Sequence, residues 1–353
     1  MKHLNPLFAV VISLAALCGC GGQSSAPTPE PEPEFWLGAD ISATTELETR
    51  GIFSYNAAGE RRENTQLMKE LGLNAVRLRV WVDPRGGWSG MQDVLTMAQR
   101  ARQHDMAIMI DFHYSDWWAD PAKQITPAAW AELDYEGLKQ AMAQHTSETL
   151  QLLKDNGIDV KWVQVGNETR NGFMWPIGHI DNMEQYAGLT TAGYDAVKSV
   201  YPESTVIVHI DNGYDNELYN RIFDGLAQYG GKWDMIGMSL YPFWAHQEHP
   251  EMDEQTTLRD CIANINAVSG KYGCDVMIVE TGVEASDPVP GKAFMAALID
   301  AMRHQTGGRC KGVFYWAPEC CHGGYKLGAF ADDRPTVIMD AFTEAARDLG
   351  YID

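Results

Sequence analysis

Apolar runs and amphipathic segments alternate along this chain. The apolar runs predict eight buried strands, at residues 35–41, 74–81, 107–113, 162–169, 205–210, 235–241, 275–281 and 312–317. Apolar positions spaced three and four residues apart predict helices, at about residues 63–71, 91–104, 135–156, 183–201, 217–229, 254–272, 292–303 and 336–349. Strict alternation favours a parallel sheet with right-handed crossovers, and eight strands allow that sheet to close. We therefore predict an α/β chain folded as a (β/α)8 TIM barrel.

Composition is consistent with one large domain. The chain has 353 residues, of which 45% are hydrophobic, and no Gly/Ser-rich break interrupts the pattern after residue 35. A (β/α)8 barrel commonly needs about 250 residues or more. We assign residues 35–353 to a single barrel domain.

The N-terminus predicts targeting and not a fold element. An apolar run at residues 7–17, preceded by Lys2, has the length of a signal-peptide core and is too short to span a bilayer comfortably. It ends in Leu17-Cys18-Gly19-Cys20, which resembles a bacterial lipobox. We expect a signal peptide at residues 1–19 and lipidation of Cys20, because the bulky Leu17 makes Cys18 the less suitable acceptor. The alternative is an ordinary secretory signal with incidental cysteines.

Residues 20–34 and the net charge bear on location and partners. This segment is rich in Pro and Glu, which predicts an extended tether for an outer-membrane or cell-surface lipoprotein, a periplasm-facing anchor being the other arrangement. The formal net charge of −21 disfavours nucleic acid, anionic lipid and polyanionic substrates such as pectate. A neutral glycan is compatible with it. We expect a monomer that meets the membrane through its lipid anchor only.

An odd number of cysteines remains beyond the lipobox, namely Cys261, Cys274, Cys310, Cys320 and Cys321. An exported protein can oxidise some of them. Cys274 and Cys310 immediately precede the last two predicted strands and are the first candidates for a disulfide; the alternative is five buried thiols. Cys320-Cys321-His322 cannot surround a tetrahedral ion without ligands from elsewhere, so spacing alone predicts no metal site.

Two predicted strands deliver a glutamate at the carboxyl end. Glu168 follows the fourth apolar run and Glu280 lies near the end of the seventh. In a (β/α)8 barrel the carboxyl ends of the strands form the open mouth, where catalytic groups collect. Two facing carboxylates suit glycoside hydrolysis, which needs an acid for the leaving oxygen and a carboxylate to attack the sugar. The alternative is a pair of structural ion pairs.

Two arginines of the second strand support this interpretation. Arg77 and Arg79 are two residues apart, so a strand places both on one face. Two buried arginines are costly unless they meet carboxylates, and we expect this face to point towards the glutamates. An arginine beside a carboxylate lowers the pKa of that carboxylate and keeps it ionised. The alternative is a solvated edge strand.

The loop after the third strand is aromatic where a turn is normally polar. It contains Asp116, Trp117 and Trp118. Exposed Trp side chains near a barrel mouth favour stacking on sugar rings, although packing in the core is an equally ordinary use of either Trp alone.

Longer segments resemble the endo-β-1,4-galactanases of glycoside hydrolase family 53, within the clan of retaining (β/α)8 glycosidases. The resemblance runs from about Trp36 to the C-terminus. It rests on Arg77-Leu78-Arg79-Val80-Trp81-Val82-Asp83-Pro84, Asp111-Phe112-His113-Tyr114-Ser115-Asp116-Trp117-Trp118-Ala119-Asp120-Pro121, Gln164-Val165-Gly166-Asn167-Glu168 and Tyr315-Trp316-Ala317-Pro318-Glu319.

The resemblance implies a role for each matching residue. Glu168 would be the general acid/base, Glu280 the nucleophile, and Asn167 a hydrogen-bond partner of the sugar 2-hydroxyl. With these roles, we expect one arginine of the second strand to lie near Glu280 and keep it ionised, and Glu168, which must be protonated, to lie away from both. Tyr241 would donate to the nucleophile and Trp316 would lie under the sugar that is cleaved. Supporting positions at strand ends and in the cleft would be His113, His209, Asp116, Trp117 and Trp118. For His209 the alternative is a core histidine with satisfied hydrogen bonds.

The resemblance also defines the competing functions. Some family members carry a calcium site in long loops late in the barrel, whereas residues 282–290 here are few and offer only Glu284 and Asp287. We expect no required metal and no cofactor. The expected activity is that of an arabinogalactan endo-β-1,4-galactanase. The alternatives are a related mannanase or xylanase, or a surface glycan-binding protein without catalysis.

Overall fold

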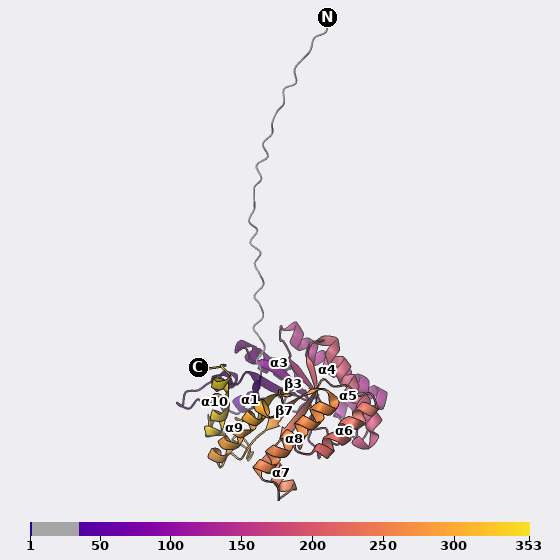
Figure 1. Cartoon of the computed structure of the whole chain (residues 1–353). Helices are drawn as coiled ribbons and strands as arrows, with labels where there is room; N and C mark the ends of the chain where they lie inside the picture. Colours follow the sequence, from indigo (N-terminus) through magenta and orange to yellow (C-terminus); the bar gives the residue numbers. More distant parts are fainter. Residues whose placement is uncertain (2–34) are drawn as a thin grey trace. The chain divides into compact units, whose positions relative to one another are not determined.

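A computed structural model describes Met1 and residues 35–353. Within this part of the chain, eight parallel strands follow one another around a closed barrel (Figure 1). Each strand pairs with the next, and the last pairs with the first. The strands are β1 (Trp36–Asp40), β2 (Ala75–Val80), β3 (Ala107–Phe112), β4 (Trp162–Val165), β5 (Thr205–Ile210), β6 (Met235–Leu240), β7 (Asp275–Thr281) and β8 (Cys310–Trp316). The predicted (β/α)8 barrel is confirmed.

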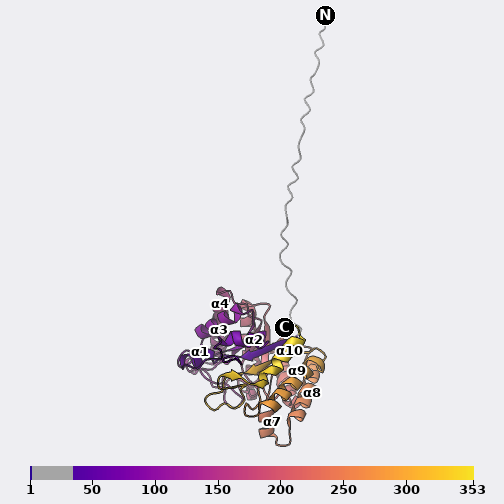
Figure 2. The same ribbon diagram turned by 90° about the vertical axis from the view of Figure 1, so that its left-hand side faces the viewer.

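Helices surround the barrel and connect its strands (Figures 1 and 2). Several begin at an acidic cap, for example Asp134 before α4 and Asp253 before α8, because a carboxylate satisfies free backbone N–H groups of the first turn. The helices that match the predicted ones are α2 (Asn64–Glu70), α3 (Met91–Gln103), α4 (Tyr135–Asp155), α5 (Met183–Val200), α6 (Asn216–Gln228), α8 (Glu254–Tyr272), α9 (Pro288–His304) and, after the last barrel strand, α10 (Asp340–Asp348).

Short elements at the mouth differ from the sequence prediction. The helices α1 (Thr44–Thr49) and α7 (Pro242–Glu248) lie in segments where no helix was predicted. A small hairpin, β9 (Phe330–Ala331) and β10 (Arg334–Pro335), follows β8. Helix α9 begins at Pro288, four residues before the predicted start, and α10 begins at Asp340 after a 3-10 turn at Val337–Met339.

The barrel interior is divided into an apolar floor and a polar upper part. Inward-facing side chains near the amino ends of the strands form one apolar cluster. It consists of Ala75, Met109, Trp162, Ile207, Met235, Met277, Val279 and Phe314. Because side chains alternate along a strand, the next inward positions are the polar residues Arg77, Asp111, Gln164 and His209. All four are fully buried, so the candidate site lies directly on the packed apolar floor.

Two local features of the strands make room for this arrangement. A Cβ atom on Gly38 would lie 2.3 Å from the ring of Phe314, so only glycine lets that ring fill the floor. In β7 the register with β6 shifts after Met238, and Ser239 pairs with Glu280. Such a bulge re-aims the side chains that follow it. Glu280 thereby joins the mouth although Met277 and Val279 both point into the floor.

The cysteines differ from the first expectation. The five cysteines of the described part of the chain are free thiols, so the predicted Cys274–Cys310 disulfide is wrong. Cys310 is the first residue of β8 and pairs with Val276, two residues beyond Cys274 along β7. That offset and the strand spacing separate the two Cα atoms by about 8 Å, beyond the reach of a disulfide.

The predicted signal peptide, lipid acceptor Cys20 and tether lie outside the described residues. Among the residues that are described, no helix is both long enough and apolar enough to cross a bilayer.

The apolar floor should carry stability. Met277 is fully buried there, so Met277→Ala should lower the free energy of unfolding by about 2–5 kcal/mol through lost burial and a residual cavity. Val289, 70% exposed at the start of α9, supplies the control: Val289→Ala should change it by less than about 0.5 kcal/mol. Urea unfolding measures both. Equal losses of unfolding free energy in the two variants would mean that burial of Met277 in the apolar floor does not stabilise the fold.

Candidate active site

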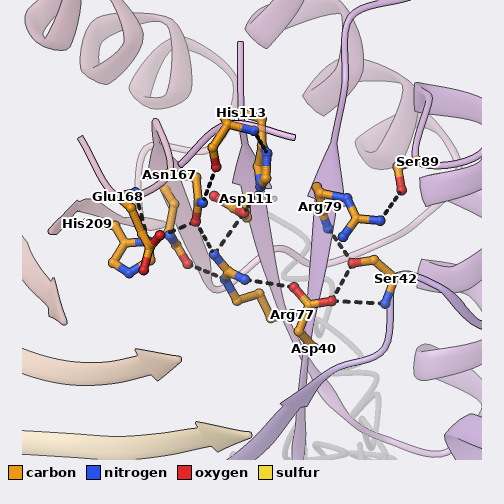
Figure 3. A network of polar contacts seen from close by, with 12 residues as sticks. Asp40, Ser42, Arg77, Arg79, Ser89, Asp111, His113, Asn167, Glu168 and His209 are labelled. Carbon is orange, nitrogen blue, oxygen red and sulfur yellow. Dashed lines mark hydrogen bonds and ion pairs between the residues drawn. The ribbon is translucent and has the colours of Figure 1, made fainter. Parts of the chain in front are cut away.

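Arg77 connects the polar groups of the barrel mouth (Figure 3). The side chain is fully buried, and its guanidinium reaches three carboxylates and two amide oxygens. Nη1 lies 2.7 Å from Asp40 Oδ2, and Nη2 lies 2.8 Å from Asp111 Oδ2 and from Glu280 Oε1. The amide partners are Gln164 Oε1 at 2.6 Å from Nε and Asn167 Oδ1 at 2.8 Å from Nη2.

This contact set explains how so many acids remain in a dry site. Burial opposes the charge of Arg77, yet the carboxylates of Asp111, Glu280 and Asp40 raise its pKa above the ordinary arginine value. Burial likewise opposes ionisation of Asp111, but the charge of Arg77 outweighs it, and the pKa of Asp111 is lowered. Removing the guanidinium would leave these charges unpaired, which is strongly destabilising.

Glu280 is the mouth carboxylate in direct contact with this cation. Burial raises its pKa, and the adjacent Arg77 guanidinium opposes that rise. The Tyr241 hydroxyl also donates to Glu280 Oε2 at 3.2 Å. The expectation that one arginine lies beside Glu280 is confirmed.

Glu168 follows β4 on a turn with unusual backbone geometry. Its φ is +47°, in the left-handed region that costs a non-glycine residue free energy. Hydrogen bonds on both sides hold this conformation: Gln124 Nε2 donates to the carbonyl of Asn167 at 2.8 Å, and the N–H of Thr169 donates to the carbonyl of His209 at 2.9 Å. The side chain is thus aimed into the mouth by the surrounding structure.

The orientation of the Asn167 amide determines the tautomer of His209. Asn167 Nδ2 donates to the carbonyl of Ala119, and its Oδ1 accepts from Arg77, each at 2.8 Å. Since Oδ1 only accepts, its 3.0 Å contact with His209 Nδ1 places a proton on Nδ1. The N–H of Glu168 also approaches Nδ1, but at 3.4 Å this is the weaker contact. Burial lowers the pKa of His209 well below its usual range, so the ring is neutral and Nε2 accepts.

The tautomer of His209 sets the direction of two more hydrogen bonds. His209 Nε2 lies 2.8 Å from Ser239 Oγ and, as an acceptor, takes the hydroxyl proton. Ser239 then has no proton left for Glu168, whose Oε1 lies 2.6 Å from the same Oγ. The short contact is therefore a hydrogen bond donated by a protonated Glu168.

The electrostatic surroundings also favour the protonated form of Glu168. Burial raises the pKa of Glu168 well above its ordinary value, and the nearby charges of Glu280 and Asp211 raise it further. The two glutamates titrate as a coupled pair. Because Arg77 contacts Glu280 directly, the shared proton resides on Glu168 and the negative charge on Glu280.

The other residues predicted from the sequence lie either among the aromatic side chains described next or in the framework of the mouth. Arg79 does not reach either glutamate; it donates to Ser89 Oγ at 3.1 Å, and its guanidinium lies 4.0 Å above the ring of Trp118. Trp118 lies 5.7 Å from Trp316, and Trp117 is 53% exposed and stacked on Trp81. These aromatic side chains extend from the glutamates to the rim of the mouth.

His113 and Asp116 lie in the framework of the mouth. His113 Nε2 is 2.9 Å from Asp111 Oδ2, while Nδ1 accepts from the indole N–H of Trp81 at 3.3 Å. Both carboxylate oxygens of Asp116 accept backbone N–H groups, from Asp83 at 3.0 Å and from residue 128 at 2.8 Å. Asp116 therefore fixes the loop that carries the Trp pair.

The two glutamates line one cleft of about 560 Å³. The wall of this cleft also contains Arg170, Asp211 and the half-exposed Trp244. Trp316 and Tyr325 line the same cleft and also a neighbouring hollow of about 390 Å³ that contains Arg79 and Trp118. Open space thus continues from the carboxylate pair into this hollow.

Several residues of the site were not predicted from the sequence. Asp40, Asp111, Gln164 and Ser239 each stand at an inward position of a strand, so a period-two count applied to every strand would have found them. Asp211 and Tyr325 belong to loops without a comparable signal, and they reach the cleft through tertiary folding.

The fold and this site together define a (β/α)8 glycoside hydrolase. The protein-family model that describes glycosyl hydrolase family 53 matches residues 36–288 of this chain. A probable arabinogalactan endo-β-1,4-galactanase A of Aspergillus fumigatus is 32% identical, over 88% of this chain and 90% of that protein. An endo-β-1,4-galactanase of Bacillus subtilis is 32% identical, over 81% of this chain and 70% of that protein.

A solved structure of fungal β-1,4-galactanases superposes with a TM-score of 0.80 and 26% identity, over 88% of this chain and 99% of that one. The chain belongs to glycosyl hydrolase family 53.

The proton on Glu168 can be tested without a substrate. In Ser239→Ala the protonated carboxyl loses its acceptor, so the pKa of Glu168 should fall. A ¹³C NMR titration of glutamate-labelled protein measures it, with the Glu168 resonance assigned by its loss in Glu168→Gln. Ser89→Ala, which removes a hydroxyl bonded to Arg79, should leave that pKa unchanged. A rise in Ser239→Ala would mean that the serine donates to a carboxylate instead.

Proposed function

We propose that this chain is an endo-β-1,4-galactanase that cleaves β-1,4-galactan, the side chain of type I arabinogalactan, with retention of configuration. The observation that carries the proposal is the asymmetry of the glutamate pair. One member lies against a buried guanidinium, and the other lies 2.6 Å from Ser239 Oγ in buried surroundings that raise its pKa. Family membership supports the choice of substrate, because relatives of this chain are named for their action on galactan.

In the first step Glu280 is the nucleophile. One of its oxygens attacks the anomeric carbon as the glycosidic bond breaks, and Glu168 passes its proton to the departing oxygen. The products of this step are a galactosyl ester of Glu280, an ionised Glu168 and the released chain end. Tyr241, which donates to Glu280 Oε2, orients the attacking carboxylate.

In the second step water hydrolyses the ester. Glu168, now ionised, takes a proton from the water as the oxygen attacks the anomeric carbon, and Glu280 leaves as a carboxylate. Two inversions give net retention. The step returns the proton to Glu168 and restores the starting state.

Asn167 and the aromatic walls position the glycan. One Asn167 N–H is used by Ala119, which leaves the second for the sugar 2-hydroxyl. Trp316 supports the sugar at the cleavage point, and Trp118 and Trp117 continue the stacking surface. The cleft at the glutamates and the hollow that adjoins it have room for more than one sugar, which supports attack within a polymer.

Linear β-1,4-galactan incubated with the purified protein should yield short galactooligosaccharides from the earliest times, the first product being the β-anomer by NMR. Glu280→Gln should lower kcat by about 10³-fold or more, because the attacking carboxylate is lost. The matched control is Glu284→Gln, an exposed glutamate four residues away, which should keep full activity.

Mannan and xylan are the discriminating substrates in the same assay. Cleavage of either in place of galactan would overturn the proposed substrate but would leave the proposed mechanism intact. Galactan that binds and is not cut would favour a glycan-binding protein, and an α-anomeric first product would exclude retention.

We also propose that the chain is a lipoprotein, held at the outer membrane or cell surface through Cys20. The support is the lipobox-like Leu17-Cys18-Gly19-Cys20 and the Pro-rich segment after it. In a bacterial host fed labelled palmitate, Cys20→Ala should lose the label and leave the membrane fraction, whereas Cys18→Ala should keep both. Label retained in Cys20→Ala would argue against this acceptor.

A further inference from the structure

Three metal-ligating side chains lie together beside the mouth, outside the glutamate site. Cys321 and His322 belong to the loop after β8, and Asp333 lies in the turn of the β9–β10 hairpin. Their candidate ligand atoms all lie within 4.8 Å of one another. Spacing in the sequence offered the Cys-His pair without a partner, and the hairpin supplies that partner from eleven residues away.

We propose that Cys321, His322 and Asp333 bind a divalent zinc-class cation. A thiolate, an imidazole and a carboxylate are ligands that Zn²⁺ accepts in a tetrahedral site, with a fourth position for water. Sulfur and nitrogen ligands disfavour Ca²⁺ and Mg²⁺, which require oxygen. The site therefore differs in chemistry from a calcium site.

The distances are close to those of a tetrahedral site. Bonds of about 2.0–2.3 Å place neighbouring ligand atoms about 3.3–3.7 Å apart. Cys321 Sγ lies 3.6 Å from Asp333 Oδ1, within this range. His322 Nε2 lies 2.6 Å from the same oxygen in a hydrogen bond, so the imidazole has to move back by about 1 Å when metal bonds replace that hydrogen bond.

The cluster is accessible and its two sides are anchored. The side chain of His322 is 45% exposed and that of Asp333 27%, so an ion reaches the site from solvent. The N–H of Cys321 donates to the carbonyl of Glu319 at 2.9 Å, and the carbonyl of Asp333 accepts from the N–H of Tyr55 at the same distance. An ion would thus join two segments that are each held by a backbone hydrogen bond of their own.

The position of the cluster gives the ion a consequence for the cleft. Tyr325 lies in the loop between the ligands, with its ring 4.9 Å from that of Trp316, and both line the cleft. An ion that ties Cys321 and His322 to the hairpin restricts this loop. The ion is expected to raise thermal stability, and binding should strengthen with pH because the thiol loses its proton to bind.

Cobalt(II) is the probe, because a cobalt–thiolate bond gives a near-ultraviolet charge-transfer band and tetrahedral cobalt gives visible bands. Titration of the chelator-treated, purified protein should show both, with one cobalt per chain, and Zn²⁺ should displace it while equimolar Ca²⁺ should not. Cys321→Ser should remove the thiolate band. Asp333→Asn and His322→Ala should each weaken binding at least tenfold.

The neighbouring thiol provides the control. Cys320 lies in the hollow with Arg79 and Trp118, and Cys320→Ser should keep the cobalt spectrum. Circular dichroism checks that each variant folds. Zn²⁺ should raise the Tm of the parent protein and of Cys320→Ser, but not that of Asp333→Asn. The absence of a thiolate band, its survival in Cys321→Ser, or its loss in Cys320→Ser would overturn the site.

Discussion

The structure of the mouth depends on one buried cation. Arg77 is fully buried and meets Asp40, Asp111 and Glu280 at 2.7–2.8 Å. Each of these charges would be strongly destabilising in this buried place if it were unpaired, and the ion pairs offset that cost. The same guanidinium fixes the amide of Asn167, and through it the tautomer of His209. Geometry and protonation in this site therefore have a common origin.

The contacts of Arg77 also explain why Glu168 and Glu280, two side chains of the same type, differ in protonation state. Burial raises the pKa of both Glu168 and Glu280. The difference comes from the contacts of each carboxyl group. Glu280 contacts the guanidinium of Arg77, whereas Glu168 contacts the hydroxyl of Ser239, which already donates its proton to His209. The proposed retaining mechanism requires this starting state, a protonated acid beside an ionised nucleophile.

Rigid and variable parts of the molecule have separate tasks. The glutamates and their supports lie on or directly after strands that rest on a packed apolar floor. The walls of the cleft come from loops and short elements, including α7 with Trp244 and the loop with Tyr325. The chemistry is therefore held by the barrel, while the loops shape the space for the glycan and carry the proposed metal ligands.

The sequence by itself determined the eight strands, the barrel, the two glutamates and the shared face of Arg77 and Arg79. These follow from periods of two and 3.6, which are local properties. Only the tertiary structure decided that Arg77 reaches Glu280 whereas Arg79 stacks on Trp118, and that Ser239 joins His209 to Glu168. It also kept Cys274 and Cys310 apart and brought Asp333 to His322. Register, bulges and loop paths set these contacts, and they depend on how distant segments pack against one another.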